Sequence, residues 1–438
     1  MVSRRFILSL IFLCFPMLNS CSESKQNGGV SNSALLREKV EIVFAHTSTM
    51  GNTGALMDRM EEDFESIHPE VDVRQMVMDD DDYQKFGLLN LFTGSSSPDI
   101  YFQWGGFLVE RDARSEFCRD LTPFIERDQF MKNFTPEGWF GCRYNKGVYL
   151  LPHSVSISVV LFYNKDIFNR LSLLPPTTWN EFIYVCKKIR DAGITPIIAG
   201  NKDLWMVGNW AAHIASRIVG EDEYHRAFSL EDEHPFTGEG WIKALGLIEK
   251  LVTIKGFNPG VVSMTEDEAK VDFITGKAAM IPDGNWLVSD IIKMNKNGPE
   301  LNYGYFNTPA ISQGKGDQNS VMAVSGGYAM GNKIRDPDLC WKFLREFFRA
   351  ERQKAWGREG IFSPVVGTRS DGEVNQVNDI VKLLKKAQKT VSPPDTGYRP
   401  TAWTAFYDAV QQILAGNKTA RQGLDEAERF IAVFRPRS

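Results

Sequence analysis

Between residues 40 and 104, apolar positions alternate between two periods. Strand-like alternation marks residues 40–44, 71–78 and 97–104, whereas residues 56–67 and 82–94 repeat their apolar positions at helical spacing. The resulting order, β-α-β-α-β, is typical of a sheet with helices packed on its faces. The fold class predicted from this half is α/β.

Two candidate site segments follow from this pattern. Sheets of this kind bind ligands beyond the carboxyl ends of their strands. His46 follows the first predicted strand, and the Gln103-Trp104 pair ends the third. We therefore expect His46 and at least one residue of the Gln103-Trp104 pair to lie near a ligand.

The same alternation restarts after residue 168. Thr178 and Glu181 are spaced as a capping box at the start of a helix, and so are Thr265 and Glu268. Apolar spacing predicts a strand at 277–282 and another at 320–332, and it predicts further helices at 241–251, 340–356, 401–416 and 424–434. Trp179 and Trp341 occupy helical positions that predict core packing.

The N-terminal end has the pattern of a lipoprotein signal. Arg4 and Arg5 precede a short apolar run that is too short to span a bilayer permanently. Residues 18–21 (LNSC) resemble a bacterial lipoprotein cleavage box, which would make Cys21 the lipidated first residue of the mature protein. Residues 22–38 are polar and small, as in a flexible tether. The alternative is an ordinary secreted protein that is cut nearby.

Length, charge and cysteine content narrow the class further. About 400 mature residues exceed what one core usually organises, so we expect two lobes. A formal net charge of −5 without a long basic block argues against nucleic acid as the partner. A disulfide between Cys118 and Cys142 and buried free thiols are both compatible with the sequence.

Motifs for chemistry are scarce. The histidines are dispersed without HExxH or CxxC partners, and the run Asp79–Asp82 lacks the Gly and distal Glu of a calcium loop, so it predicts a solvated helix start. No GxSxG, P-loop or dinucleotide fingerprint occurs. We expect no catalytic residues, no metal and no cofactor. Asp99 and Asp283 near predicted strand ends leave a glycosidase-like carboxylate pair as the alternative.

Seven segments in a fixed order resemble one family. They are SPDIYF, GVYLLPHSVSISVVLFYNKDIF, LPPTTWNEF, FITGKAAMIPDGNW, VSGGYAM, WKFLREFF and FYDAVQQILAGNKTARQGLDEAERF, within residues 40 to 432. In this order they resemble the carbohydrate-binding group of extracellular solute-binding proteins of bacterial ATP-binding-cassette importers.

The resemblance implies a two-lobed periplasmic-binding-protein-like fold, with two mixed sheets flanked by helices and a hinge that the chain crosses several times. It implies lobe one at 39–153 plus 319–356 and lobe two at 157–307 plus 362–438. The candidate crossings are PHSVSIS, NTPAISQGKG and the stretch near GIFSP. Solute is expected in the cleft between the lobes.

A sugar ring presents an apolar C–H face, which an aromatic ring can cover, and polar edges, which amides, carboxylates and Arg can bind. Trp286, with Asn285 before it, follows a predicted strand and is expected to stack on a sugar, as an aromatic at this place does in the family. Packing against the neighbouring helix is the alternative. The other candidate ligand contacts are Trp104, Gln103, Trp205, Trp210, Gly326, Gly327, Trp403, Arg399 and His46.

These observations predict an extracytoplasmic, lipid-anchored binding protein. It would capture a sugar or oligosaccharide as a monomer and deliver it to the membrane permease of an ATP-binding-cassette importer. Two alternatives stay open: a secreted carbohydrate-active enzyme, and a binding protein for another solute such as a polyol phosphate, a peptide or a polyanion. Anionic solutes would favour several Arg or Lys at the site rather than aromatic rings.

Overall fold

The computed structural model describes residues 39–48, 51–83, 97–296, 298, 300–368, 380, 382–384, 386–387 and 389–434 of the 438-residue chain. The predicted signal and tether, residues 1–38, lie outside the described residues. Most of the helix predicted over 82–94 does so too.

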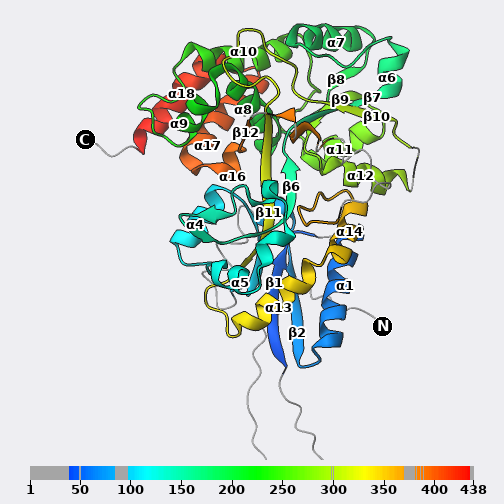
Figure 1. Ribbon diagram of the computed structural model, residues 1–438. Coiled ribbons are helices and arrows are strands. Elements are labelled where there is room, and N and C mark those ends of the chain that lie inside the picture. Colours follow the sequence, from blue (N-terminus) through cyan, green and yellow to red (C-terminus); the bar gives the residue numbers. More distant parts are fainter. Residues whose placement is uncertain are drawn as a thin grey trace, which may run out of the picture. The chain divides into compact units, whose positions relative to one another are not determined.

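The larger of two main sheets has the strand order β12-β11-β3-β1-β2, with β6 paired to β11 (Figure 1). β1 is parallel to β2 and β3, whereas β11 is antiparallel to both β3 and β6. The bounds of its strands are Val40–His46 (β1), Val71–Val77 (β2), Ile100–Trp104 (β3), Leu151–Ile157 (β6), Val321–Met330 (β11) and Thr390–Val391 (β12). All three strands predicted between residues 40 and 104 are therefore present.

The smaller main sheet has the order β10-β7-β9-β8. β7 is antiparallel to β9 and β10, and β8 is parallel to β9, so the sheet is mixed, as expected. Its strands are β7 (Val160–Asn164), β8 (Thr195–Ile197), β9 (Ala278–Asp283) and β10 (Tyr303–Phe306), and a separate hairpin joins β4 (Arg143–Tyr144) to β5 (Gly147–Val148).

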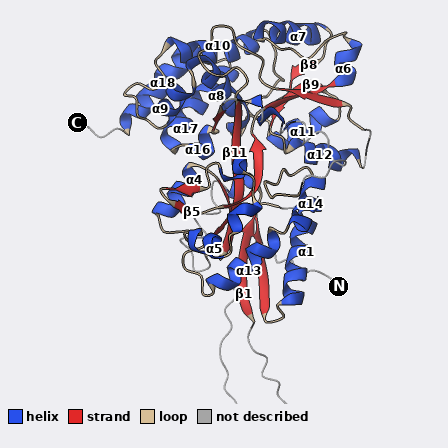
Figure 2. Cartoon of the chain, in the orientation of Figure 1, coloured by secondary structure: helices blue, strands red, loops and turns tan. Residues whose placement is uncertain are grey.

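Helices flank both main sheets (Figure 2). α1 packs on β2, α4 on β3 and α13 on β11, whereas α6, α7 and α11 pack on the smaller sheet, and α8, α9, α10, α17 and α18 pack on one another. The bounds are α1 (Gly51–Ile67), α2 (Asp80–Asp82), α4 (Phe107–Arg114), α5 (Thr122–Arg127), α6 (Lys165–Arg170), α7 (Trp179–Asp191), α8 (Trp205–Val219), α9 (Glu221–Phe228), α10 (Glu239–Thr253), α11 (Glu266–Ile274), α12 (Leu287–Asn295), α13 (Pro337–Phe347), α14 (Ala350–Arg358), α16 (Pro394–Gly397), α17 (Pro400–Leu414) and α18 (Ala420–Val433).

Two adjacent strands contribute to both main hydrophobic cores. In β6, Leu151 packs in the core of the larger sheet and Ile157 in the core of the smaller sheet. In β11, Met330 packs in the core of the larger sheet and Val321 in the core of the smaller sheet. Because β6 and β11 are hydrogen-bonded to each other (Figure 1), the chain passes between the two cores through a pair of continuous strands.

A third passage follows α14. Trp356 belongs to the core of the larger sheet and Phe362 to that of the smaller one, and the Val155 N–H donates to the Phe362 carbonyl at 3.0 Å. Residues 307–316, in contrast, do not form the expected crossing. Their loop supplies backbone donors to the end of α8, where Gly316 N–H binds the Arg217 carbonyl at 3.1 Å, because the last carbonyls of a helix lack partners within the helix.

Local capping signals explain several helix ends. Both predicted capping boxes form, at Thr178 and at Thr265. The helix predicted over 340–356 is instead two helices, α13 and α14. Its break is stabilised by Gln353, whose amide Nε2 donates to the Phe347 carbonyl at the end of α13 at 2.8 Å. The last helix, α18, starts at Ala420, earlier than predicted, because Thr419 caps it in a third capping box.

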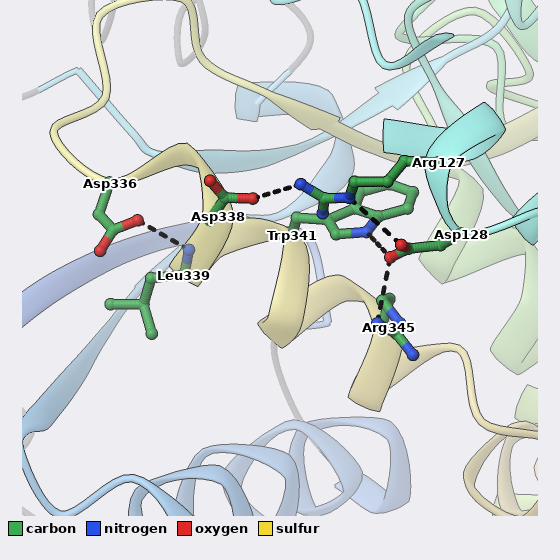
Figure 3. A network of polar contacts seen from close by, with 7 residues as sticks. All are labelled: Arg127, Asp128, Asp336, Asp338, Leu339, Trp341 and Arg345. Carbon is green, nitrogen blue, oxygen red and sulfur yellow. Dashed lines mark hydrogen bonds and ion pairs between the residues drawn. The ribbon is translucent and has the colours of Figure 1, made fainter. Parts of the chain in front are cut away.

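A polar network fixes α13 against the segment that ends α5 (Figure 3). Asp128 accepts from the Trp341 indole Nε1–H at 2.7 Å and from Arg345 at 3.1 Å, and Arg127 pairs with Asp338 at 2.6 Å. Both Trp341 and Trp179 are buried in cores, as predicted. The four described cysteines, Cys118, Cys142, Cys186 and Cys340, are buried free thiols, so the Cys118–Cys142 disulfide is absent from the structure.

Candidate functional site

Trp286 lies directly after β9, at the start of α12, with its ring partly exposed. The ring lies over Gly284: a Cβ at that glycine would be 2.1 Å from the ring atom Cζ3. The indole Nε1–H donates to Glu266 Oε1 at 2.9 Å. The turn therefore leaves room for the ring, and α11 holds its polar edge.

Asn285 fixes this turn to the strand that passes between the two cores. Its side-chain Oδ1 accepts from the Ile157 N–H at 2.8 Å, and its own N–H donates to the Ile157 carbonyl at 3.1 Å. Asn285 is 2% exposed. Asn285 was predicted to contact ligand; in the structure it is buried and positions the turn that carries Trp286.

A second partly exposed indole lies beside Trp286. Trp205 is the first residue of α8, and its ring centroid is 5.8 Å from that of Trp286, with an interplanar angle of 60°. α8 begins after Leu204, which has a left-handed backbone conformation with φ of 71°. The two rings together form an aromatic surface contributed by two different helices.

Buried polar groups link α8 to α17. Asn209, one turn beyond Trp205, accepts at Oδ1 from the Tyr407 hydroxyl at 2.5 Å. The Tyr407 ring lies 5.4 Å from that of Trp403, which is partly exposed and whose indole N–H has no partner among the described residues. Asp395 forms hydrogen bonds with Asn209 and Tyr407. Burial raises the pKa of Asp395 to about 6, although these hydrogen bonds act in the opposite direction.

Trp104 is the partly exposed aromatic of the larger sheet. It ends β3, opposite Gly326 of β11, and its ring packs edge-on against Phe102 at 5.1 Å. The chain then continues through Gly105 to Gly106, where a Cβ would be 3.0 Å from Gly397 Cα of α16. The end of β3 thus approaches the helix that carries Asp395.

Gln103, the neighbour of Trp104, is 1% exposed and faces α4. Its Nε2 donates to Asp112 Oδ2 at 2.5 Å, and its Oε1 accepts from the Trp104 N–H at 3.0 Å. Of the predicted pair, only Trp104 therefore has surface to offer a ligand.

Several other predicted contacts are core residues in the structure. Trp210 is fully buried, with its ring edge-on to Phe182 at 5.8 Å. His46 is also fully buried, and both ring nitrogens are occupied: Nε2 bonds Gln75 at 2.8 Å, and Nδ1 accepts from the Ser48 N–H at 3.2 Å. Burial, only partly offset by the bond to Gln75, lowers the pKa of His46 to about 4, so the ring is neutral at pH 7. Neither side chain has surface available for a ligand.

The glycine pair of β11 serves strand packing. A Cβ at Gly326 would be 2.8 Å from the Phe102 ring, and one at Gly327 would be 2.1 Å from the Leu151 carbonyl. The pairing of β6 with β11 shifts register between these two glycines. Glycines in a strand often mark such an irregularity. Close approach here is between strands rather than between backbone and ligand.

Arg399 is exposed at the start of α17, four residues before Trp403. Asp99 precedes β3, at the end of that strand opposite to Trp104, and its Oδ2 accepts from the Val43 N–H at 2.7 Å. Asp283 ends β9 among Glu266, Lys270 and Asp290. The two carboxylates have separate surroundings, so the geometry offers no support for a glycosidase pair.

Sequence reasoning missed the charged side chains next to Trp286. Lys270, one turn beyond Glu266 on α11, is buried with its ammonium Nζ 2.7 Å from Glu266 and 3.3 Å from Asp290. Burial by itself would lower the pKa of Lys270, but these carboxylates and Asp283 raise it well above its usual value. The Glu-x-x-x-Lys spacing could have indicated the pair of Glu266 and Lys270, but the same spacing is equally common on solvated helices.

A surface pocket of about 660 Å³ borders α11, lined by Pro259, Gly260, Ser263, Met264, Asp267, Glu268, Val271 and Asp272, and it includes none of the predicted contacts. Among the described residues no helix is long and apolar enough to cross a membrane.

The fold and the site define a two-lobed α/β binding protein whose partly exposed tryptophans come from both main sheets and their flanking helices. The model of the bacterial extracellular solute-binding proteins matches residues 47–354. The chain belongs to this family.

Individual relatives are distant but span most of the chain. An uncharacterized ABC transporter extracellular-binding protein of Pyrococcus horikoshii is 22% identical over 445 residues, covering 98% of this chain and 96% of the relative. The multiple sugar-binding protein of Streptococcus mutans is 22% identical over 378 residues, covering 83% of each. The sn-glycerol-3-phosphate-binding periplasmic protein of Pectobacterium atrosepticum is 25% identical over 305 residues, covering 64% of this chain and 65% of the relative.

Solved structures share the fold over nearly the whole described chain. A chitin oligosaccharide binding protein superposes with a TM-score of 0.82 at 20% identity, covering 90% of this chain and 99% of that one. A solute-binding protein in complex with raffinose gives a TM-score of 0.73 at 17% identity, with the same coverage. At these identities the likeness establishes the two-lobed fold.

Proposed function

We propose that the protein captures a saccharide between its two lobes and delivers it to the permease of an ATP-binding-cassette importer. The observation that carries the proposal is the pair of partly exposed indoles Trp286 and Trp205, whose ring centroids lie 5.8 Å apart. Such flat apolar rings match the C–H face that a sugar presents. Relatives and structural neighbours that bind sugars support the same choice.

The candidate residues have different roles in binding the sugar. Trp286 and Trp403 stack on sugar faces, Trp205 extends the Trp286 surface, and Trp104 covers the sugar from the larger sheet. Arg399 binds hydroxyls at the rim. This division follows from exposure, since each of these side chains has surface to offer.

Lobe one comprises residues 39–153 plus 319–356, and lobe two comprises 157–307 plus 362–438. The passages through β6, β11 and residues 356–362 act as the hinge, so that a ligand bound to both lobes selects the closed form. Support for the division comes from the two hydrophobic cores, with Val321 and Met322 at the start of β11 packing in the core of the smaller sheet.

The protein acts outside the cytoplasm as a monomer, anchored through a lipid on Cys21, and it performs no chemistry on its ligand. Support comes from the family, whose members are extracellular binding proteins, and from the cleavage-box pattern at residues 18–21. Cys21→Ala is expected to abolish lipid labelling. Labelling that persists in this variant would contradict the anchor.

A thermal-shift panel tests the ligand class. Neutral saccharides, sn-glycerol 3-phosphate and short peptides are added separately to the purified protein. At a hundred times its dissociation constant, a ligand stabilises the folded state by about 2.7 kcal/mol, which is a readily measured rise in melting temperature. We expect this rise with at least one neutral saccharide. A rise with peptides or glycerol phosphate and with no saccharide would overturn the proposal.

A further inference from the structure

The polar edge of Trp286 lies in a strongly acidic environment. Glu266 accepts the indole N–H at 2.9 Å, so one carboxylate is held directly against the ring. The Lys270 ammonium lies 2.7 Å from Glu266, 3.3 Å from Asp290 and 3.6 Å from Asp267. Three carboxylates therefore share one ammonium group, and two negative charges remain uncompensated within this set.

Asp283 adds a second, independent observation. It is 1% exposed, its Oδ1 accepts from the Gly284 N–H at 2.7 Å, and its Oδ2 has no partner among the described residues. Burial first, and then the Glu266 carboxylate, raise its pKa well above the usual range. The turn below the ring thus holds a buried carboxyl group with an unused oxygen, which faces the same charged set.

From this arrangement we infer that the subsite at Trp286 rejects phosphorylated and other anionic solutes and accepts an uncharged sugar unit. This inference rests on the proposed function and narrows it to neutral saccharides. A phosphate or carboxylate stacked near Trp286 would lie beside Glu266, which bonds the indole and shares the Lys270 ammonium with Asp290. One unit charge at about 6 Å, in a medium of effective dielectric about 20 to 40, changes the binding constant by about tenfold or more.

The buried ammonium group does not offset this repulsion. Lys270 is already bonded to Glu266 and lies near Asp290, and leaving those partners would cost both of them their counter-charge. The polar edge of the Trp286 ring therefore differs from an anion site, in which Arg or Lys side chains present free donors to the ligand. Glycerol phosphate, the solute in the name of one relative, fits this subsite poorly.

The test compares the effect on anion binding of removing the negative charge of Glu266 with that of removing the charge of its neighbour Asp267. Glu266→Gln keeps an oxygen that can accept the Trp286 N–H but removes the charge beside the ring. Asp267→Asn is the matched control, since this residue is next along α11 and removes the same charge, while its side chain is 91% exposed. Neutral probes are maltotriose, cellotriose, chitotriose and raffinose; anionic probes are glucose 6-phosphate, glucuronate and sn-glycerol 3-phosphate.

Titration calorimetry identifies the neutral probe that binds best, and competition against it measures the anions. We expect the wild-type protein to bind the neutral probe with no competition from the anions. Glu266→Gln should strengthen anion competition by about tenfold, and Asp267→Asn should change it by less than about twofold.

Three outcomes would overturn the inference: anions that compete as well as neutral sugars in the wild type, equal effects of the two substitutions, or no gain in anion binding in Glu266→Gln. Failure of the proposed function is distinct, because in that case none of the neutral probes binds the wild-type protein at all.

Discussion

Replacing Trp286 by alanine separates a ligand-stacking role from a structural one. The ring is partly exposed, so its removal takes away surface that a ligand could cover. Within the protein it makes one hydrogen bond, to Glu266, and one described ring contact, to Trp205. Glu266 keeps its bond to Lys270 when the indole is lost, so no buried charge is left without a partner.

The expected magnitudes follow from these contacts. Loss of a stacking face should weaken sugar binding by about 1–3 kcal/mol, from buried apolar area and aromatic contact. Since about 1.4 kcal/mol is a factor of ten in dissociation constant, the change lies within the range of titration calorimetry. Trp286→Phe retains a smaller apolar face and loses only the bond to Glu266, so its binding defect should be smaller.

Trp210→Ala is the matched control for stability. Trp210 is fully buried in the core of the smaller sheet, and removing such a side chain should lower the free energy of unfolding by about 3–5 kcal/mol. Trp286→Ala should cost clearly less, because part of the ring is already in water. Urea denaturation of both variants measures this difference directly.

The combination of the two assays decides the role of Trp286. If Trp286→Ala destabilises the fold as much as Trp210→Ala, while the folded fraction binds sugar with unchanged affinity, the ring is structural and the stacking surface must be sought at Trp403 and Trp104. Normal stability with a weakened titration supports the stacking role.

Three further substitutions follow from the same region. Gly284→Ala should displace the Trp286 ring, because the added Cβ would be 2.1 Å from it, and should reproduce much of the binding loss of Trp286→Ala; unchanged affinity would contradict the ring position. Lys270→Met should lower the free energy of unfolding by about 3 kcal/mol or more, measured in urea, because it leaves Glu266 without its counter-ion; a change below about 1 kcal/mol would mean that the pair is effectively solvated. Burial raises the Asp395 pKa to about 6 from 3.8, so the folded state binds the extra proton between these values and stability falls as pH rises through them, by up to about 3 kcal/mol. Asp395→Asn should remove this fall, and denaturation curves at pH 4 and pH 7 that keep the wild-type difference would refute the assignment.

The sequence predicted what depends on neighbours along the chain. Strand alternation located β1, β2 and β3, and the Thr-x-x-Glu pattern located the starts of α7 and α11, because a capping box is completed within four residues. The order of segments indicated the two-lobed fold. The burial of His46 could not be predicted in this way. Its ring is bonded to Gln75, a residue of another strand, and no local sequence pattern indicates that contact.

The charged surroundings of Trp286 could not be predicted for the same reason. Glu266 and Trp286 are twenty positions apart, and β9 lies between α11 and the turn that carries the ring. Their hydrogen bond exists only because α11 packs on β9 and returns its first turn to the end of that strand. A single carboxylate in the sequence gives no sign of such a return.

The sequence could not show which of Trp205 and Trp210 is exposed, because the helix that carries both was not predicted. α8 was not predicted, because almost every residue after its first turn is buried and its apolar positions show no face. Once the segment is a helix, geometry decides the matter. At about 100° per residue, Trp210 lies about 140° around the axis from Trp205, so the two rings point to different sides, whereas Asn209 lies only about 40° away. The exposed indole and the amide that receives the Tyr407 hydroxyl therefore share a face. A ligand that contacts Trp205 is for this reason expected to stay away from Trp210, which lies in the core.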